Sequence, residues 1–308
     1  MSSVPPSPTE SSTTPSEDHG KSGLDPNILI DQVIGGLGAT AYEVVPWFIE
    51  QMPLMYFQDT DLETQVTHLR AIIAAKASGR PIELTLRSED GTQWTSMRPQ
   101  DYCGVLADLV RELPRDRELR AAKIHTASDG KLVLDTFEFG EASRFDADDP
   151  EQQEKLQQIL QYAREHEMPC APEELTNYLH RCPAEYVRTV TPLRICRHFK
   201  VIREVDSTDG TTVALEPESD SSVSRIVVAA SNARTRTMIE RIATRLSQSQ
   251  INIHRAYLDR IDDEAGGWVS MLGFVVNSPD GGPMDESSDL WADVRRDLLR
   301  LKWLDERT

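Results

Sequence analysis

The sequence has few cysteines and no long hydrophobic run. Its 308 residues include four cysteines, Cys103, Cys170, Cys182 and Cys196, which are too few and too widely spaced for a disulfide framework. No apolar run approaches the roughly 20 residues that span a bilayer, and the N-terminus has neither the basic start nor the apolar core of a secretory signal. We therefore expect reduced thiols in a cytoplasmic protein that has no membrane partner.

Positive charge is also scarce. The 33 Lys and Arg residues are outnumbered by 51 Asp and Glu residues, which gives a formal net charge of −18. Nucleic acids and anionic membrane surfaces repel a protein of this charge. The composition therefore favours small molecules or other proteins as partners and argues against a general affinity for nucleic acid.

The beginning of the chain lacks the apolar residues that could form a core. Residues 1–24 are mainly Ser, Thr, Pro and Glu, and this composition predicts a disordered tail. Residues 25–58 then contain two apolar segments, which predict a helical bracket packed against the part of the chain that follows. The remaining length is sufficient for two ordinary domains, each with its own core.

Two later stretches show the same order of predicted elements: helix, hairpin, helix, hairpin. The first is residues 59–140, where Thr60 and Glu63 form a capping box. Its hydrophobic periodicity predicts a helix that ends near Gly79, strands over 82–86, 93–97, 118–126 and 131–139, and a helix over 99–113. The second is residues 183–308, with predicted helices over 183–201, 234–246 and 289–304 and strands over 211–215, 224–230, 251–261 and 267–276. A helical connector over 141–182 joins the two stretches.

This order predicts an α+β protein made of two ferredoxin-like modules, each an antiparallel sheet with its helices on one face. In the second module a fourth strand should follow the last helix. Either strand 211–215 occupies that place, or the chain is a piece of something longer. We find no clear residue-by-residue repeat between the two modules, so the inference of a duplication rests on element order alone.

The second module resembles an ACT domain. The resemblance is carried by the run RIVVAASNAR from Arg225 to Arg234, the amphipathic helix after it, and the strand that begins INIHRA at Ile251. In that family small ligands, often amino acids, lie near the turn between the first strand and the first helix, at a domain interface. The resemblance implies an effector site at Ser231, Asn232 and Arg234. A purely structural role in oligomerisation is the alternative.

A longer set of residues resembles the N-terminal region of large NAD-dependent glutamate dehydrogenases, in which ACT-like modules precede a Glu/Leu/Phe/Val-dehydrogenase core. The residues concerned are Met52 to Phe57, Thr60, Gln65, His68 to Ile72 and Asp297 to Leu304. The resemblance spans roughly residues 40–308. It implies a regulatory or assembly region of a homo-oligomeric oxidoreductase that converts glutamate to 2-oxoglutarate and ammonia. A stand-alone ACT-like binding protein is the alternative.

The catalytic features of that family have no counterpart in the chain. Neither its catalytic lysine in a glycine-rich setting nor its dinucleotide-binding domain is present among the 308 residues. We therefore expect no catalytic residue and no cofactor in this chain. NAD is expected only in a dehydrogenase catalytic domain attached in the same polypeptide.

Two other patterns could suggest different functions. An RNA-recognition motif shares the strand–helix order of the arginine-rich segment, but the strand from Arg225 to Ser231 lacks the exposed aromatic residues that stack on bases. A solvated helix face is the favoured interpretation, and Arg234 and Arg236 near a helix N-terminus could also hold a carboxylate. The His and Cys residues near Cys182 and Cys196 lack the close cysteine pairs of structural zinc sites, so we expect no metal site.

Overall fold

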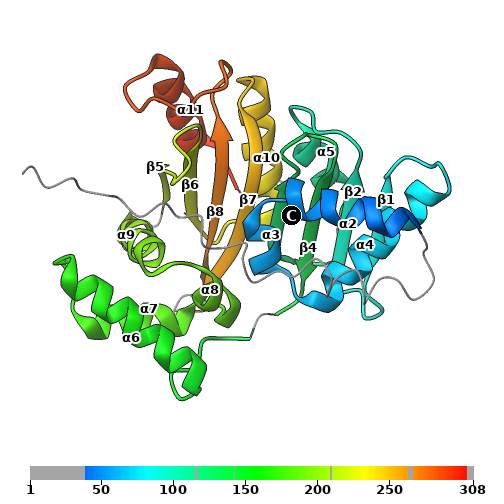
Figure 1. Cartoon of the computed structure of the whole chain (residues 1–308). Coiled ribbons are helices and arrows are strands. Elements are labelled where there is room, and N and C mark those ends of the chain that lie inside the picture. The colour runs from blue at the N-terminus through cyan, green and yellow to red at the C-terminus, as the bar shows by residue number, and fades with distance from the viewer. Residues whose placement is uncertain (1–38, 115–116, 142, 209, 263–265, 304–308) are drawn as a thin grey trace, which may run out of the picture.

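The computed structural model describes residues 39–303, except 115–116, 142, 209 and 263–265. The predicted disordered tail, residues 1–24, and the first part of the predicted helical bracket therefore lie outside the described residues. The rest of the bracket consists of two helices, α2 (Ala39–Gln51) and α3 (Leu54–Asp59). The order of the elements after it agrees with the predicted order (Figure 1).

All eight described strands belong to a single antiparallel sheet. They are β1 (Leu84–Arg87), β2 (Gln93–Arg98), β3 (Leu119–Thr126), β4 (Val133–Phe139), β5 (Thr211–Pro217), β6 (Ser224–Ser231), β7 (Asn252–Asp262) and β8 (Trp268–Asn277). Their order in the sheet is β1-β2-β4-β3-β7-β8-β6-β5. The prediction of an α+β protein with antiparallel strands is confirmed. The prediction of two separate sheets is wrong, because β3 pairs with β7, from Ala122 opposite Leu258 to His125 opposite Arg255.

The strand order is the same when the sheet is followed inward from either edge. The strands β1, β2, β4 and β3 of the first half occupy the places that β5, β6, β8 and β7 occupy in the second. Because the central pair β3–β7 is antiparallel, an approximate two-fold axis relates the two halves. The strand β5 lies beside β6 at the sheet edge, which is the place that the sequence left open in the second module.

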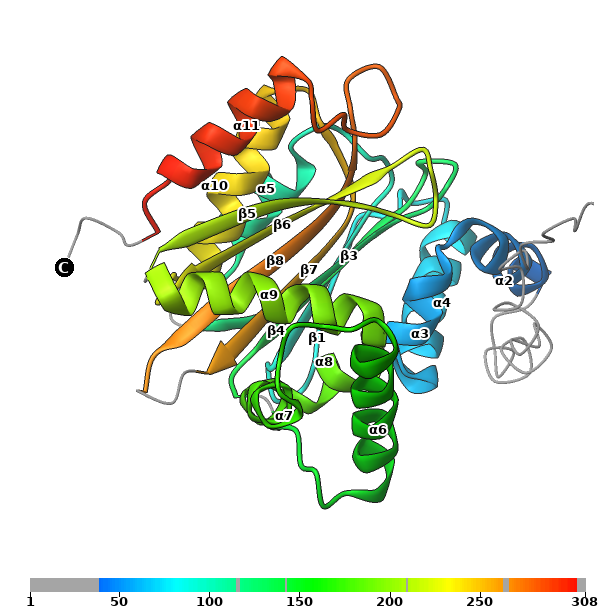
Figure 2. The same cartoon turned by 90° about the vertical axis from the view of Figure 1, so that its left-hand side faces the viewer.

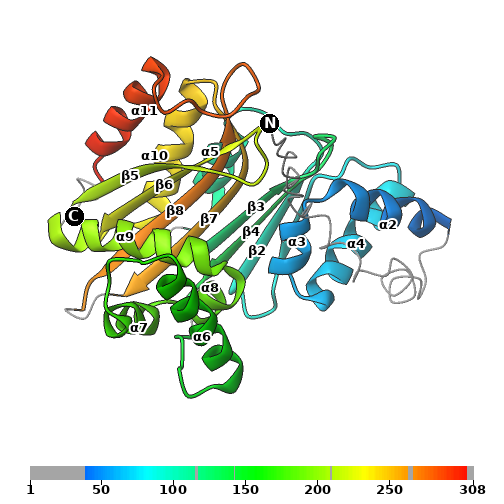
Figure 3. The same cartoon turned by 60° about the vertical axis from the view of Figure 1, so that its left-hand side comes forward.

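Helices cover both faces of the sheet, not one face as predicted. Figures 2 and 3 show α5 (Val105–Glu112), α10 (Thr235–Gln248) and α11 (Asp289–Arg300) on one face, and α4 (Leu62–Ala77) and α9 (Pro192–Thr208) on the other. The strand β6 shows why. Ile226 and Val228 belong to the core under α10, whereas Val227 and Ala229 belong to the core under α9. A continuous apolar run of this kind is typical of a strand that is buried on both faces.

The connector contains α6 (Pro150–Glu165) and α7 (Pro172–Arg181), and a third helix, α8 (Ala184–Thr189), follows it before α9. The single helix predicted over 183–201 is wrong, because the chain is extended at Val190, with φ −82° and ψ 139°, and starts a new helix at Pro192. Proline has no N–H and disfavours a helical conformation in the residue before it. The break places Thr189, Val190, Thr191 and Arg194 at the junction of the two halves.

A pair of buried residues recurs in both halves at the same spacing. The hydroxyl of Tyr56 lies 2.9 Å from Nδ1 of His68, twelve residues later. The hydroxyl of Tyr186 lies 3.0 Å from Nδ1 of His198, again twelve residues later. A proline precedes each tyrosine by three residues and caps its helix, at Pro53 and Pro183. This pattern is the residue-level repeat that the sequence analysis did not identify, and it supports duplication of one unit.

Removal of the Tyr56 hydroxyl should destabilise the protein. The variant Tyr56→Phe leaves the buried Nδ1 of His68 without its partner, and we expect the free energy of unfolding to fall by about 1–3 kcal/mol. Urea denaturation measures this difference. The matched control is Tyr42→Phe, because Tyr42 is 61% exposed and its loss should change little. Equal stabilities of wild type and Tyr56→Phe would contradict the assignment.

The same pair predicts a pH dependence of stability. Burial lowers the pKa of His68 to about 4, with a further lowering by His125 and an opposing effect of Asp61. From pH 6.5 down to about 4 the unfolded chain therefore binds a proton that the folded chain does not, and stability falls as the pH falls. We expect a loss of roughly 3 kcal/mol over this window relative to His68→Gln, which does not titrate there. Parallel pH profiles of the two proteins in urea denaturation would exclude this role of His68.

Candidate functional site

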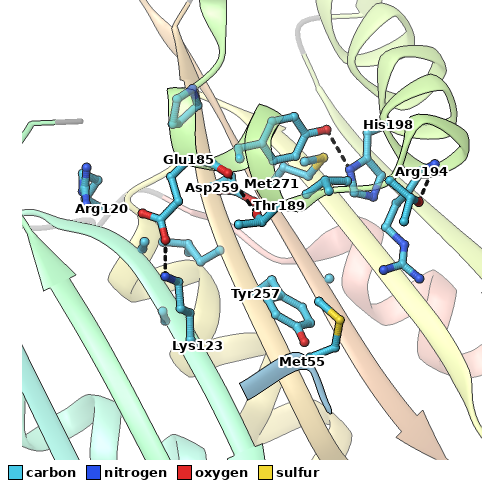
Figure 4. Close-up of a pocket in the computed structure, with 18 of the residues that line it drawn as sticks. Met55, Arg120, Lys123, Glu185, Thr189, Arg194, His198, Tyr257, Asp259 and Met271 are labelled. Atoms are coloured by element: carbon cyan, nitrogen blue, oxygen red, sulfur yellow. Dashed lines mark hydrogen bonds and ion pairs between the residues drawn. The ribbon is translucent and has the colours of Figure 1, made fainter. Parts of the chain in front are cut away.

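A cavity of about 260 Å³ lies where the two halves meet, on the α9 side of the sheet. Figure 4 shows residues from both halves around it. The central strands contribute Lys123 of β3 and Tyr257 of β7, and the helices contribute Met55 of α3, Glu185 of α8 and Arg194 of α9. Pockets for drug-sized ligands have volumes of roughly 300–1,000 Å³. This cavity is slightly smaller, so it suits a small metabolite and is too small for a dinucleotide.

The alternation of side chains along the two central strands produces this cavity. Ala122 and Leu258 point into the core under α5 and α10. Their neighbours Lys123 and Tyr257 are opposite each other in the register and point to the other face, because successive strand residues alternate between faces. We call the β3–β7 pair the seam between the two halves. Along this seam one face of the sheet is therefore apolar and packed, whereas the other is polar and forms a wall of the cavity.

Two arginines share one buried carboxylate beside the cavity. Nε of Arg225 lies 2.5 Å from Oε1 of Glu218, and Nη2 of Arg194 lies 3.0 and 3.1 Å from the two carboxylate oxygens. Burial alone would raise the pKa of Glu218, but Arg225 and Arg194 together lower it. The carboxylate therefore stays ionised, and it balances only one of the two guanidinium charges.

A glycine makes room for the more deeply buried of these arginines. A Cβ atom at Gly273 would lie 3.1 Å from Nη1 of Arg225. The Arg225 guanidinium lies over the ring of Tyr257, 5.5 Å from its centroid, and its side chain is only 4% exposed. A larger residue at position 273 would therefore displace the guanidinium and reduce the cavity, which Gly273 also lines.

A chain of three buried side chains leads to the cavity from behind. The hydroxyls of Tyr178 and Tyr186 are 2.9 Å apart, and that of Tyr186 is 3.0 Å from Nδ1 of His198. Burial, together with Arg225, Arg194 and Arg197, keeps the pKa of His198 well below its usual value. The imidazole is therefore neutral, and among the described residues its Nε2 has no hydrogen-bond partner.

The other side of the cavity carries acidic groups. The ammonium of Lys123 forms an ion pair with Glu185 and lies 3.4 Å from Oε1 of Glu138. Asp259 also lines the cavity, and Figure 4 shows Glu185 and Lys123 across the cavity from Arg194 and His198. The site can thus hold a small molecule that carries opposite charges at its two ends.

The predicted effector residues do not surround a common cavity. Asn232 has φ 50°, and its side-chain oxygen accepts a hydrogen bond from the Trp268 N–H at 3.3 Å, so it holds the turn against β8. The Ser231 N–H donates to the Gly210 carbonyl at 3.2 Å. Arg234 precedes α10 and lines a separate hollow of about 750 Å³, together with Arg236. Exposed residues, among them Arg234 itself, form part of that hollow.

The sequence offered two signals for the cavity residues. Arg225 is the second residue of a strand that is apolar between its two terminal serines, which is an unusual place for a buried cation. His198 occupies the position that His68 occupies in the first half, as the shared spacing from Tyr186 and Tyr56 shows. Neither signal identifies a site alone, because the residues that meet at the cavity lie far apart in the chain.

Two of the four cysteines, Cys182 and Cys196, are buried. Burial raises the pKa of the Cys182 thiol and raises that of Cys196 to about 11, so these thiols are protonated at neutral pH. The described part of the chain holds no group of three or more His, Cys, Asp or Glu side chains arranged to bind a metal ion. Within the same residues, no helix is both long and apolar enough to cross a membrane.

Comparison with known proteins gives no family assignment. No model of a protein family matches the chain, and no curated protein matches its sequence.

Proposed function

We propose that the chain is a non-catalytic regulatory region that binds a small effector in the cavity between its two halves. The observation that carries this proposal is the cavity itself. It is of metabolite size, both halves contribute to it, and it has a basic side and an acidic side. Ligand sites commonly occupy such junctions between structural units.

The position of the cavity suggests how a bound effector could change the arrangement of the two halves. A molecule held there contacts β3 and α3 of the first half and β7, α8 and α9 of the second. Its binding would favour one arrangement of the halves over others. A ligand shifts an equilibrium only by its difference in affinity for the two states, and a site shared between two units is sensitive to their relative position.

The sequence resemblances support an amino acid as the effector. The opposite charges across the cavity suit the ammonium and carboxylate groups of such a molecule. The longer resemblance supports an NAD-dependent glutamate dehydrogenase as the enzyme that is regulated, with NAD in its catalytic domain, and supports assembly as a homo-oligomer. The residues behind that resemblance include Tyr56 and His68, which are buried and bonded to each other.

A thermal-shift screen of the purified chain against the common amino acids tests the proposal. At about 100 times Kd a bound amino acid adds roughly 2.7 kcal/mol to the free energy of unfolding, which raises Tm by several degrees in a protein of this size. We expect Gly273→Val and Thr189→Trp, which obstruct the cavity in different ways, to abolish the shift. The control Arg234→Gln should retain it.

Two outcomes would contradict the proposal. If no amino acid raises Tm, the proposal of an amino-acid effector is wrong, and the purely structural role in oligomerisation is the remaining alternative. A shift that survives both cavity variants but disappears in Arg234→Gln would place the site at the turn after β6. Cooperative unfolding of each variant in urea shows that its fold is intact.

A further inference from the structure

One buried polar atom in the cavity is left unused by the fold. Nε2 of His198 has no hydrogen-bond partner among the described residues, although the side chain lines the cavity and the residue is only 5% exposed. A buried polar atom without a partner costs about 1–3 kcal/mol. Such an atom in the wall of a cavity points to a partner that enters with a ligand.

The hydrogen-bond chain behind His198 determines which kind of partner fits. Suppose that Nδ1 of His198 donated to Tyr186. Tyr186 would then donate to Tyr178, and the buried Tyr178 proton would be left with the sulfur of Cys182, a weak acceptor. In the opposite direction Tyr178 donates to Tyr186, and Tyr186 donates to Nδ1. The second arrangement gives both hydroxyl protons strong acceptors and places the imidazole proton on Nε2, which therefore donates into the cavity.

Arg194, which lies beside His198, also has hydrogen-bond donors that the fold does not use. Arg194 contacts Glu218 through Nη2, and its Nη1 and Nε have no side-chain partner among the described residues. Its side chain is 24% exposed and lines the cavity, so these donors are accessible to a small molecule. Arg225 uses the same Glu218 carboxylate, and the nearby Glu216 pairs with Arg197, so three guanidinium groups face two carboxylates at this end.

The side chains that line the cavity are more often basic than acidic. Arg120, Lys123, Arg194 and Arg225 lie there against Glu185 and Asp259, while Glu138 and Glu218, which pair with these cations, lie outside the lining. In a partly buried site each of these charges acts over a longer range than in water. An acidic amino acid, with two carboxylates and one ammonium, matches this excess better than a neutral one.

We infer that Arg194 and His198 form a carboxylate subsite, in which one ligand carboxylate accepts hydrogen bonds from an unused N–H donor of Arg194 and from Nε2–H of His198. A hydrogen bond between a guanidinium and a carboxylate is charge-assisted and therefore stronger than a neutral one. This assignment rests on the proposed function and adds to it the ligand class, an acidic amino acid. It also gives the Tyr178–Tyr186 pair a positioning role, because they fix the tautomer of His198.

Isothermal titration calorimetry with L-glutamate, L-glutamine and L-isoglutamine tests the subsite. The two amides each replace one carboxylate, and we expect at least one of them to bind roughly ten- to hundredfold more weakly than L-glutamate, the range for a charge-assisted hydrogen bond. In Arg194→Met the affinity for L-glutamate should fall by a similar factor. The difference between acid and amide should largely disappear.

Two matched variants separate the subsite from general effects of charge. Arg203→Met removes one positive charge from the same helix, but Arg203 pairs with Glu174 at 3.4 Å and does not line the cavity, so affinity should be unchanged. His198→Gln keeps an amide donor and should retain more affinity than His198→Leu. Equal losses in Arg194→Met and Arg203→Met would overturn the inference.

The result with wild type distinguishes this inference from the proposed function. If L-glutamate does not bind but another amino acid raises Tm in the screen and fails to do so in the cavity variants, the proposed function stands and the acidic subsite is wrong. If L-glutamate binds and neither Arg194→Met nor His198→Leu weakens it, the carboxylate lies elsewhere. A loss that is specific to these two positions supports the subsite.

Discussion

The pairing of β3 with β7 is the interaction on which the rest of the structure depends. Without it each half would end in an edge strand whose backbone N–H and C=O groups lack partners, a state that proteins usually avoid. Pairing removes both edges at once and makes one sheet of eight strands. It also brings α5 against α10, where Arg111 contacts Glu240 at 3.1 Å. The same pairing forms the cavity on the other face, because residues of both β3 and β7 line it.

Local sequence patterns were sufficient to predict most of the elements. Alternating and helical periodicities predicted strands close to β1–β8 and helices close to α6, α10 and α11, because these patterns reflect which side of each element is buried. Caps were less predictable. Asp61, not Thr60, caps α4, with its carboxylate accepting from the Thr64 N–H at 2.9 Å. Both residue types suit the position, so the sequence alone does not decide which of them caps the helix.

The joining of the two halves could not be predicted in the same way. Whether two edge strands pair depends on surfaces that are far apart in sequence, and β3 and β7 lie more than a hundred residues apart. One clue was available, since the apolar run of β6 is buried on both faces and therefore requires a helix on each side. The repeat of Pro53, Tyr56 and His68 as Pro183, Tyr186 and His198 is also present in the sequence, but three shared residues in sixteen are a weak signal.

The cavity does not coincide with the predicted effector turn, for a related reason. A resemblance to a ligand-binding turn directs attention to adjacent residues, here Ser231 to Arg234, and the structure gives Asn232 of this turn a role in holding the backbone. The cavity is made instead by side chains from α3, α8, α9 and the central strands. A site at a seam between two copies of one unit has no contiguous motif, because each copy supplies only part of it.

Hydrogen exchange with and without L-glutamate tests most directly the central claim that the seam between the halves is the ligand site. Bound ligand should suppress the local opening of the elements that it joins. We predict slower amide exchange in β3, β7 and the segment from α8 into α9, on both sides of the seam. Slower exchange confined to residues 231–236, or none in either half under conditions where calorimetry detects binding, would contradict the account.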